Sequence, residues 1–167
     1  ERDVFGVAVG AGEEEATSFG GVLFHDDEQG EACGAEIHPA TIAEWRTKEG
    51  QKQVIGQAEI YPMAVARVTW PEKHRGRKVI FFVDNDSARI ASIKGYSPVL
   101  PSLRIIMENV RWDCLHDCAS WYGRVPTSSN IADDPSRMDS HLLKTVFGAR
   151  IVKPILPLGG LYAGVLK

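Results

Sequence analysis

The stretch "VIFFVDNDSAR", Val79 to Arg89, decides the fold class of this chain. Its five leading apolar residues are continuous rather than alternating, which is the pattern of a central strand covered on both faces. The strand then ends abruptly in Asp84, Asn85 and Asp86. In α/β sheets, ligands bind beyond the carboxyl ends of strands, so acids at this position are candidates for a functional site.

Two further regions place acids where apolar surroundings are expected. Glu59 lies in "IGQAEIYPMAVA", among apolar residues at helical spacing. Asp133 and Asp134 lie where the last predicted strand gives way to the last predicted helix. A charged group in such a place is costly unless it is paired or bound to a cation. Acids from three separate elements therefore favour a site for Mg²⁺ or Mn²⁺, which prefer oxygen ligands.

Helix capping is the alternative explanation for several of these acids. Asp84 or Asp86 can accept amide hydrogens at the start of the helix that follows. Asp134 precedes Pro135, and proline is favoured in the first turn of a helix, so Asp134 is a natural N-cap. Capping and metal binding both remain open on these residues alone.

The remaining pattern predicts a mixed α/β sheet. The first three strands form an antiparallel meander, with Glu13 to Glu15 in the solvated turn between the first two. Pro62 predicts a kink in the second helix, or a regular helix that begins near it. A meander followed by crossover units gives a mixed sheet with helices on its faces. The predicted strands are residues 3–9, 18–26, 32–38, 77–84 and 119–127, and the predicted helices are residues 39–50, part of 53–73, 86–95, 101–117 and 130–147.

The length of 167 residues predicts one domain with its own core, with or without an appendage. We expect residues 1–148 to form the domain. Residues 149–167 are apolar and rich in proline and glycine, and we expect them to form a C-terminal tail. The tail is either an extended wrap over the domain or a docking segment for a protein partner.

Composition excludes several classes of protein. The formal net charge is −3, from 19 basic and 22 acidic residues, so the chain has no strong nonspecific attraction for phosphates. Three cysteines, Cys33, Cys114 and Cys118, suggest neither a disulfide framework nor a complete zinc site. No apolar run approaches the roughly 20 residues that a transmembrane helix needs. The chain begins at Glu1 rather than at Met, so we expect it to be processed, trimmed or a fragment, and the sequence indicates no compartment.

Three blocks of the sequence resemble, in order, the ribonuclease H domain of reverse-transcribing elements. The family has a mixed five-stranded sheet whose first three strands are antiparallel, which agrees with the pattern above. The motifs that carry the resemblance are "VDN" followed by "A" and "KG", and "N.AD.PSR" after a strand. The three blocks are "QVIGQAEIYPMAVARVTW" (53–70), "KVIFFVDNDSARIASIKGYSP" (78–98) and "WYGRVPTSSNIADDPSR" (121–137).

This resemblance implies a catalytic role for the three acids. Glu59, Asp84 and Asp133 match the family's helix, strand-end and last-helix acids, so they would bind Mg²⁺ or Mn²⁺ and act on the RNA strand of an RNA–DNA hybrid. Recognition of RNA in such a hybrid depends on contacts to 2′-hydroxyls and the backbone. Solvation is the alternative role of scattered basic and polar residues. The candidates for backbone contact are Lys94, Arg124, Ser128, Asn130 and Arg137.

One position departs from the family pattern. The family has an aspartate in its first strand, and the best-matching stretch here is "AVGA", Ala8 to Ala11, so Val9 stands in its place. An isopropyl group offers no oxygen to a metal ion and leaves the other acids to repel one another. The chain is therefore either a metal-dependent ribonuclease H-type endonuclease derived from a retroelement, or a catalytically inactive module that serves as a structural or binding subunit of a larger assembly.

Overall fold

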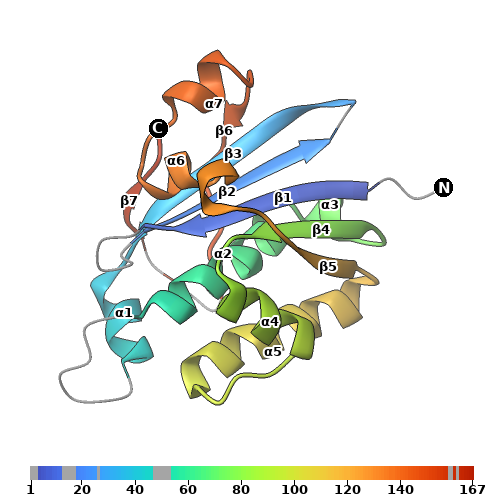
Figure 1. The fold of residues 1–167 in the computed structure, drawn as a ribbon, viewed down its shortest axis with the longest axis vertical. Coiled ribbons are helices and arrows are strands. Elements are labelled where there is room, and N and C mark those ends of the chain that lie inside the picture. The colour runs from blue at the N-terminus through green and yellow to red at the C-terminus, as the bar shows by residue number, and fades with distance from the viewer. Residues whose placement is uncertain (1–3, 13–17, 26, 47–53, 158–159, 161) are drawn as a thin grey trace.

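The computed structural model describes residues 4–12, 18–25, 27–46, 54–157, 160 and 162–167 (Figure 1). The predicted turn at Glu13 to Glu15 lies outside these residues. The strands are β1 (Val4–Ala11), β2 (Ser18–His25), β3 (Glu28–Ile37), β4 (Lys78–Val83), β5 (Ala119–Arg124), β6 (Arg150–Ile151) and β7 (Tyr162–Val165). The helices are α1 (Pro39–Trp45), α2 (Ile55–Thr69), α3 (Pro71–His74), α4 (Asp86–Lys94), α5 (Leu100–His116), α6 (Asp133–Ser136) and α7 (His141–Thr145), with a 3-10 turn, η1 (Thr127–Ser129).

The strands form one mixed sheet in the order β5-β4-β1-β2-β3-β6, with β7 also paired to β3. Strands β1, β2 and β3 pair antiparallel, whereas β4 pairs parallel with both β1 and β5. This arrangement confirms the predicted mixed α/β sheet. The described sheet has more strands than the five predicted, because two short segments of the tail, β6 and β7, pair with β3. The described parts of the tail therefore wrap the domain.

Strand β4 is central, as its apolar run predicts, but its two faces differ in burial. Val79, Phe81 and Val83 are fully buried, whereas Ile80 and Phe82 are half-buried. The cause is the placement of the helices (Figure 1). Helices α2, α4 and α5 lie on one side of the sheet, and α6 contacts the other side over β1, β2 and β3. The side of β4 that faces away from α2 is thus covered less completely.

Two predicted helices differ from the observed ones. Helix α2 runs without a break from Ile55 to Thr69 with Pro62 inside it, so the helix does not begin near Pro62. The predicted helix over residues 130–147 is instead two short helices, α6 and α7. Met138, between α6 and α7, has a left-handed backbone with φ of 62°, so the two helices cannot be continuous. Ser140 is the N-cap residue of α7. No helix among the described residues is long and apolar enough to cross a bilayer.

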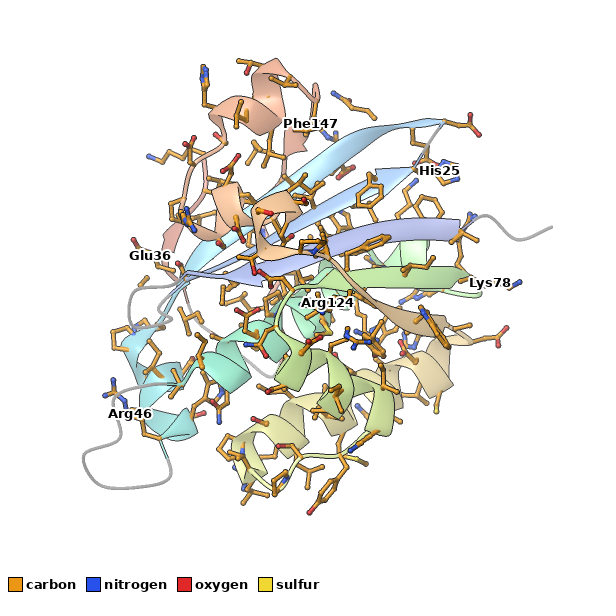
Figure 2. The ribbon with its side chains drawn as sticks, viewed as in Figure 1. His25, Glu36, Arg46, Lys78, Arg124 and Phe147 are labelled. Atoms are coloured by element: carbon orange, nitrogen blue, oxygen red, sulfur yellow. The ribbon has the colours of Figure 1, made fainter. Side chains whose placement is uncertain are left out.

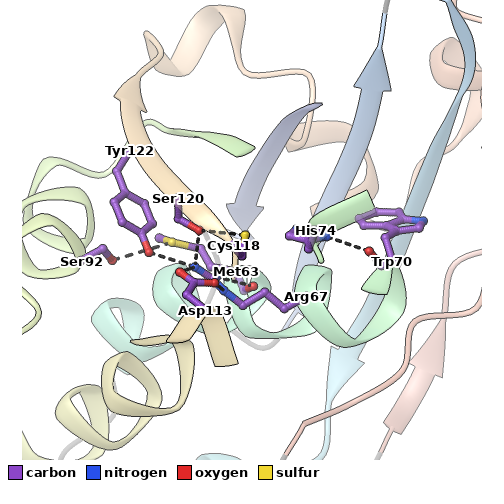
Figure 3. Close-up of polar contacts among 9 residues, drawn as sticks. All are labelled: Met63, Arg67, Trp70, His74, Ser92, Asp113, Cys118, Ser120 and Tyr122. Carbon is purple, nitrogen blue, oxygen red and sulfur yellow. Dashed lines mark hydrogen bonds and ion pairs between the residues drawn. The ribbon is translucent and has the colours of Figure 1, made fainter. Parts of the chain in front are cut away.

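A buried arginine fixes α2 against its neighbours (Figure 3). The Arg67 guanidinium is 1% exposed and makes two 2.8 Å hydrogen bonds to the Asp113 carboxylate on α5. It also donates to the hydroxyls of Ser120 and Tyr122 on β5, each at 3.0 Å, and to the Met63 carbonyl at 2.9 Å. A buried charge is tolerated only when its donors are satisfied in this way. The network therefore sets the position of α2 relative to α5 and β5.

His74 is a second polar side chain inside the core, and it predicts a pH dependence of stability. Its Nδ1 lies 2.7 Å from the Trp70 carbonyl oxygen, while its Nε2 is buried with no hydrogen-bond partner (Figure 3). Burial lowers the pKa of His74 to about 4, and the nearby Arg67 charge acts in the same direction. Because the folded pKa lies below the unfolded value, the stabilising contribution is present near pH 7 and is lost as pH falls toward 4.

We expect the free energy of unfolding to fall by about 2 kcal/mol between pH 7 and pH 5 through His74 alone. Urea denaturation of the wild type and of His74→Phe at both pH values gives the slope of the free energy of unfolding against pH. The difference in this slope between the two proteins measures the contribution of His74. His141→Gln, which changes an exposed histidine, is the matched control and should keep the wild-type slope. Equal slopes in the wild type and His74→Phe would contradict the assignment.

Candidate functional site

The three acids selected from the sequence line one pocket. Its volume is about 200 Å³, and it lies where the carboxyl ends of β1 and β4 meet α2, η1 and α6. The structure thus brings together side chains that are distant in the chain. The lining residues are Ala11 of β1, Glu59 of α2, Asp84 and Asn85 after β4, Thr127 of η1 and Asp133 of α6.

Parallel pairing of β1 with β4 places Asp84 at the pocket. Ala8 pairs with Phe82, so both strands run to the same edge and Asp84 follows the last residue of β4. Helix α4 is capped by Asn85, whose side chain accepts a 2.9 Å hydrogen bond from the Ala88 amide. The capping explanation is therefore wrong for Asp84. The side chain of Asp84 is available to the pocket, and its Oδ1 is buried without a hydrogen-bond partner.

Glycines in the sheet allow α6 to carry Asp133 into the same pocket. A Cβ on Gly34 would lie 2.5 Å from the Pro135 carbonyl oxygen, and one on Gly20 would collide with the Ser136 backbone nitrogen. Glycine inside a strand often marks such a close approach of another backbone. The residue before α6 is Ala132, and no side chain caps this helix, so the predicted N-cap role of Asp134 is also wrong.

The carboxyl group of Glu59 is buried and strongly perturbed. It is 7% exposed, and its Oε2 has no hydrogen-bond partner. Burial, followed by the charges of Asp84 and Asp133, raises the pKa of Glu59 to about 8. Perturbed carboxyl groups that face one another in a pocket are typical of functional sites. The uncharged form of Glu59 therefore dominates near neutral pH.

The donor chemistry of the pocket fits Mg²⁺ or Mn²⁺, because all three side chains offer oxygen and two of those oxygens are buried without partners. Their arrangement is less complete. Among the residues that the structure describes, no three Asp, Glu, His or Cys side chains are close enough together to hold a metal ion. The three acids thus supply the right ligand type, but they do not form a closed ligand set.

Strand β1 brings no oxygen-bearing side chain to the pocket. Val9 and Ala11 lie on the same face of β1 and belong to the same core cluster, because side chains two positions apart share a face. Val9 is completely buried, and Ala11 is the β1 residue that lines the pocket. The sequence pointed to Val9, and the structure adds Ala11 as a second β1 position beside the acids. The alternation of side chains along β1 places both residues on the face toward α2. Which of the two reaches the pocket is known only from the structure.

A second pocket, of about 340 Å³, adjoins the first and shares Thr127 and Asp133 with it. It is lined by three of the five predicted backbone contacts, Ser128, Asn130 and Arg137. Arg137 is 53% exposed and lies 3.8 Å from the Asp133 carboxylate, so a cation already stands beside one of the acids.

The other predicted contacts are placed differently. Asn130 is 5% exposed, and its amide group is used within the protein: it donates to the Val9 carbonyl at 3.0 Å and accepts from the Ala132 amide at 3.1 Å. Arg124 lies on β5 (Figure 2) and is 64% exposed, 3.7 Å from the Asp86 carboxylate. Lys94 is exposed in the last turn of α4. Neither Arg124 nor Lys94 lines either pocket.

The raised pKa of Glu59 predicts that this acid destabilises the metal-free protein at alkaline pH. Its stabilising contribution is fully present below the usual glutamate pKa of 4.5 and is lost as pH rises toward 8. Urea denaturation in EDTA gives the difference in the free energy of unfolding between Glu59→Gln and the wild type. We expect this difference to favour the variant by about 2–4 kcal/mol more at pH 8 than at pH 5. Glu72→Gln, at an exposed position, is the control. A difference that does not change with pH would refute this assignment.

Comparison with known proteins identifies the fold. No family model and no curated protein matches the chain. Among solved structures, RNase H1 from the halophilic archaeon Halobacterium salinarum superposes with a TM-score of 0.54 at 14% identity, covering 79% of this chain and 91% of that one. The N-terminal RNase H domain of a Mycobacterium tuberculosis protein, fused to maltose-binding protein, gives a TM-score of 0.53 at 10% identity and covers 81% and 94%. The chain therefore has a ribonuclease H-like fold.

Proposed function

We propose that this chain is a ribonuclease H-fold module of retroelement origin with an impaired site for hydrolysing the RNA strand of an RNA–DNA hybrid. The observation that carries the proposal is the pocket in which Glu59, Asp84 and Asp133 meet while β1 contributes Ala11. The fold and the three sequence blocks around these acids support the origin. The aliphatic residues of β1 support the impairment.

In this proposal, Glu59, Asp84 and Asp133 hold Mg²⁺ or Mn²⁺. A bound ion supplies an activated water and stabilises charge on the phosphate. The protein's own residues position the nucleic-acid backbone, and Glu59 releases one proton. Thr127 is shared between the two pockets, so a strand that reaches the acids also passes Ser128 and Arg137. Glu59 gives up its proton before it can act as a ligand.

Impairment follows from the ligand count. A two-ion mechanism needs carboxylates that serve both ions about 3.5–4 Å apart. Val9 and Ala11 provide no side-chain oxygen, so among the described residues that line the pocket only three carboxylates would be left to neutralise the ions. Weak ion binding and slow hydrolysis are the expected result.

A catalytically inactive module that serves as a structural or binding subunit is the second candidate. It is favoured by exposed apolar side chains in and just after α7: Leu142 is 49% exposed, Val146 66% and Phe147 58%. These residues directly precede the tail, so a protein partner would contact the C-terminal region. The tail itself is held to β3 by β6 and β7, and such a partner would therefore meet a folded surface.

Cleavage of a labelled RNA–DNA hybrid with Mg²⁺ or Mn²⁺ tests the proposal. We expect little cleavage by the wild type and at least about tenfold more by Ala11→Asp, because one lost transition-state interaction costs roughly that factor or more. Val9→Asp places a carboxylate at a fully buried position, so we expect it to lower stability more than Ala11→Asp does. Asp84→Asn in the Ala11→Asp background should abolish the gain.

The outcomes separate the two candidates. Strong cleavage by the wild type that is lost in Asp84→Asn would overturn both the impairment and the inactive module. Inertness of the wild type, Val9→Asp and Ala11→Asp alike, with all three folded, would favour the binding subunit.

Ion binding can be measured without activity. Because Glu59 must lose a proton, we expect Mn²⁺ to bind about 10- to 30-fold more tightly at pH 8.5 than at pH 6.5. Titration calorimetry, or broadening of NMR signals by Mn²⁺, gives the affinities. Glu59→Gln should reduce the pH dependence, and Asp84→Asn should weaken binding at both pH values. An affinity that does not change with pH would argue against Glu59 as a ligand.

A further inference from the structure

Helix α5 has two apolar faces, and only one of them packs into the domain. The inner face, which includes Ile105, Ile106 and Asn109, is buried and contacts α2. A second set of apolar side chains recurs along the helix at alternating intervals of three and four residues. This set, which we call the outer stripe, consists of Leu100, Leu103, Met107, Val110 and Cys114.

Much of the outer stripe is open to solvent. Leu100 is 55% exposed, Met107 52% and Val110 40%, and Cys114 is also exposed, while Leu103 is half-buried. A helix that is apolar on opposite sides is normally covered on both. Intervals of three and four residues are those of the a and d positions of a coiled coil, whose side chains insert between those of a second helix. The stripe spans two heptads of a helix that is already formed and held in place.

The charges beside the stripe are arranged asymmetrically. Arg104 and Arg111 each follow a d-type residue, so both lie along the same flank, where e positions would be. Both are exposed, and Arg111, at 68%, lies 3.6 Å from Glu108. The opposite flank is turned toward the domain. Its residues are Ile106, which is buried, and Asp113, which pairs with Arg67. The accessible flank of the stripe is therefore positively charged.

We propose that the outer stripe of α5 binds an amphipathic helix of a partner protein, with apolar residues at a and d and acidic residues facing Arg104 and Arg111. Binding of a helix by apolar anchors at this spacing is a recurrent mode of recognition. Because α5 is preformed and anchored through Asp113, the protein has little ordering cost to meet on binding. The charged flank selects the partner and its orientation.

A second copy of this chain is a poor occupant for the same reason. In an antiparallel pair, e positions face e positions, so the arginines of the two copies would meet and repel. In a parallel pair, e positions face g positions, and here those are the buried Ile106 and the engaged Asp113. No residue of the stripe lines the acidic pocket or its neighbour, so the surface is independent of whether the pocket hydrolyses RNA.

Binding of two matched peptides to the full 167-residue chain tests the proposal. Each is a labelled three-heptad helix with leucine at a and d, and the residues at e and g are glutamate in one and lysine in the other. In fluorescence anisotropy, we expect the glutamate peptide to bind at least about tenfold more tightly than the lysine peptide. Met107→Glu should abolish binding, and the double variant Arg104→Glu with Arg111→Glu should reverse the preference. Val4→Glu, at an exposed apolar position at the start of β1, is the control and should bind as the wild type does.

All variants change exposed side chains, and their melting temperatures establish that they are folded. Equal affinity for both peptides, or binding that survives Met107→Glu, would overturn the proposal. So would self-association in sedimentation experiments that Met107→Glu removes, because the stripe would then be covered by a second copy. Failure of the peptides leaves the cleavage and Mn²⁺ experiments unaffected, since those depend on residues outside the stripe.

Discussion

The parallel pairing of β4 between β1 and β5 is the constraint on which the candidate site depends. Ala8 lies opposite Phe82, and Val83 lies opposite Arg124, so three strands run to the same edge of the sheet. Whatever follows them is brought together there: Asp84 after β4 and Thr127 after β5. Helices α2 and α6, on opposite sides of the sheet, add one acid each. The chemistry of the pocket is thus a consequence of strand direction.

Helix α2 carries a buried arginine and a buried glutamate that differ in their hydrogen-bond partners. The charge of Arg67 is balanced by Asp113, and its donors reach two hydroxyls and a carbonyl. Glu59, eight residues earlier on the same helix, has a buried oxygen with no partner. Losing one member of a buried pair costs about 3–5 kcal/mol, so the Arg67 network is a structural anchor. The fold supplies partners for the polar groups of Arg67 but none for the buried oxygen of Glu59. An unpartnered buried acid is the pattern expected where function, rather than stability, accounts for a residue.

Several features were predictable from local pattern, and the failures have physical causes. The apolar run before Asp84 indicates a central strand, and three acids from separate elements indicate a shared pocket. Strands β6 and β7 were missed because segments of two and four residues become strands only by pairing with an existing edge. The close approach of α6 to Gly20 of β2 and Gly34 of β3 was also not predicted, because it depends on a helix that lies about a hundred residues away in the sequence. Capping by Asp84 or Asp86 was one of two open alternatives, and Asn85 caps instead, since asparagine and aspartate are alike in this role.

The two margins of the sheet are finished differently. Beyond β3, the described residues place the short β6 and β7, and the Lys167 carbonyl accepts hydrogen bonds from the Ser140 hydroxyl and the Lys144 ammonium. At the other margin, β5 is the last strand of the described sheet, and its Trp121 is 70% exposed. Strands as short as β6 and β7 are poor templates for backbone pairing, whereas a six-residue strand can accept a neighbour. Stacking of molecules through their sheets would therefore end at a pair, because the tail closes the margin from which a fibre would have to grow.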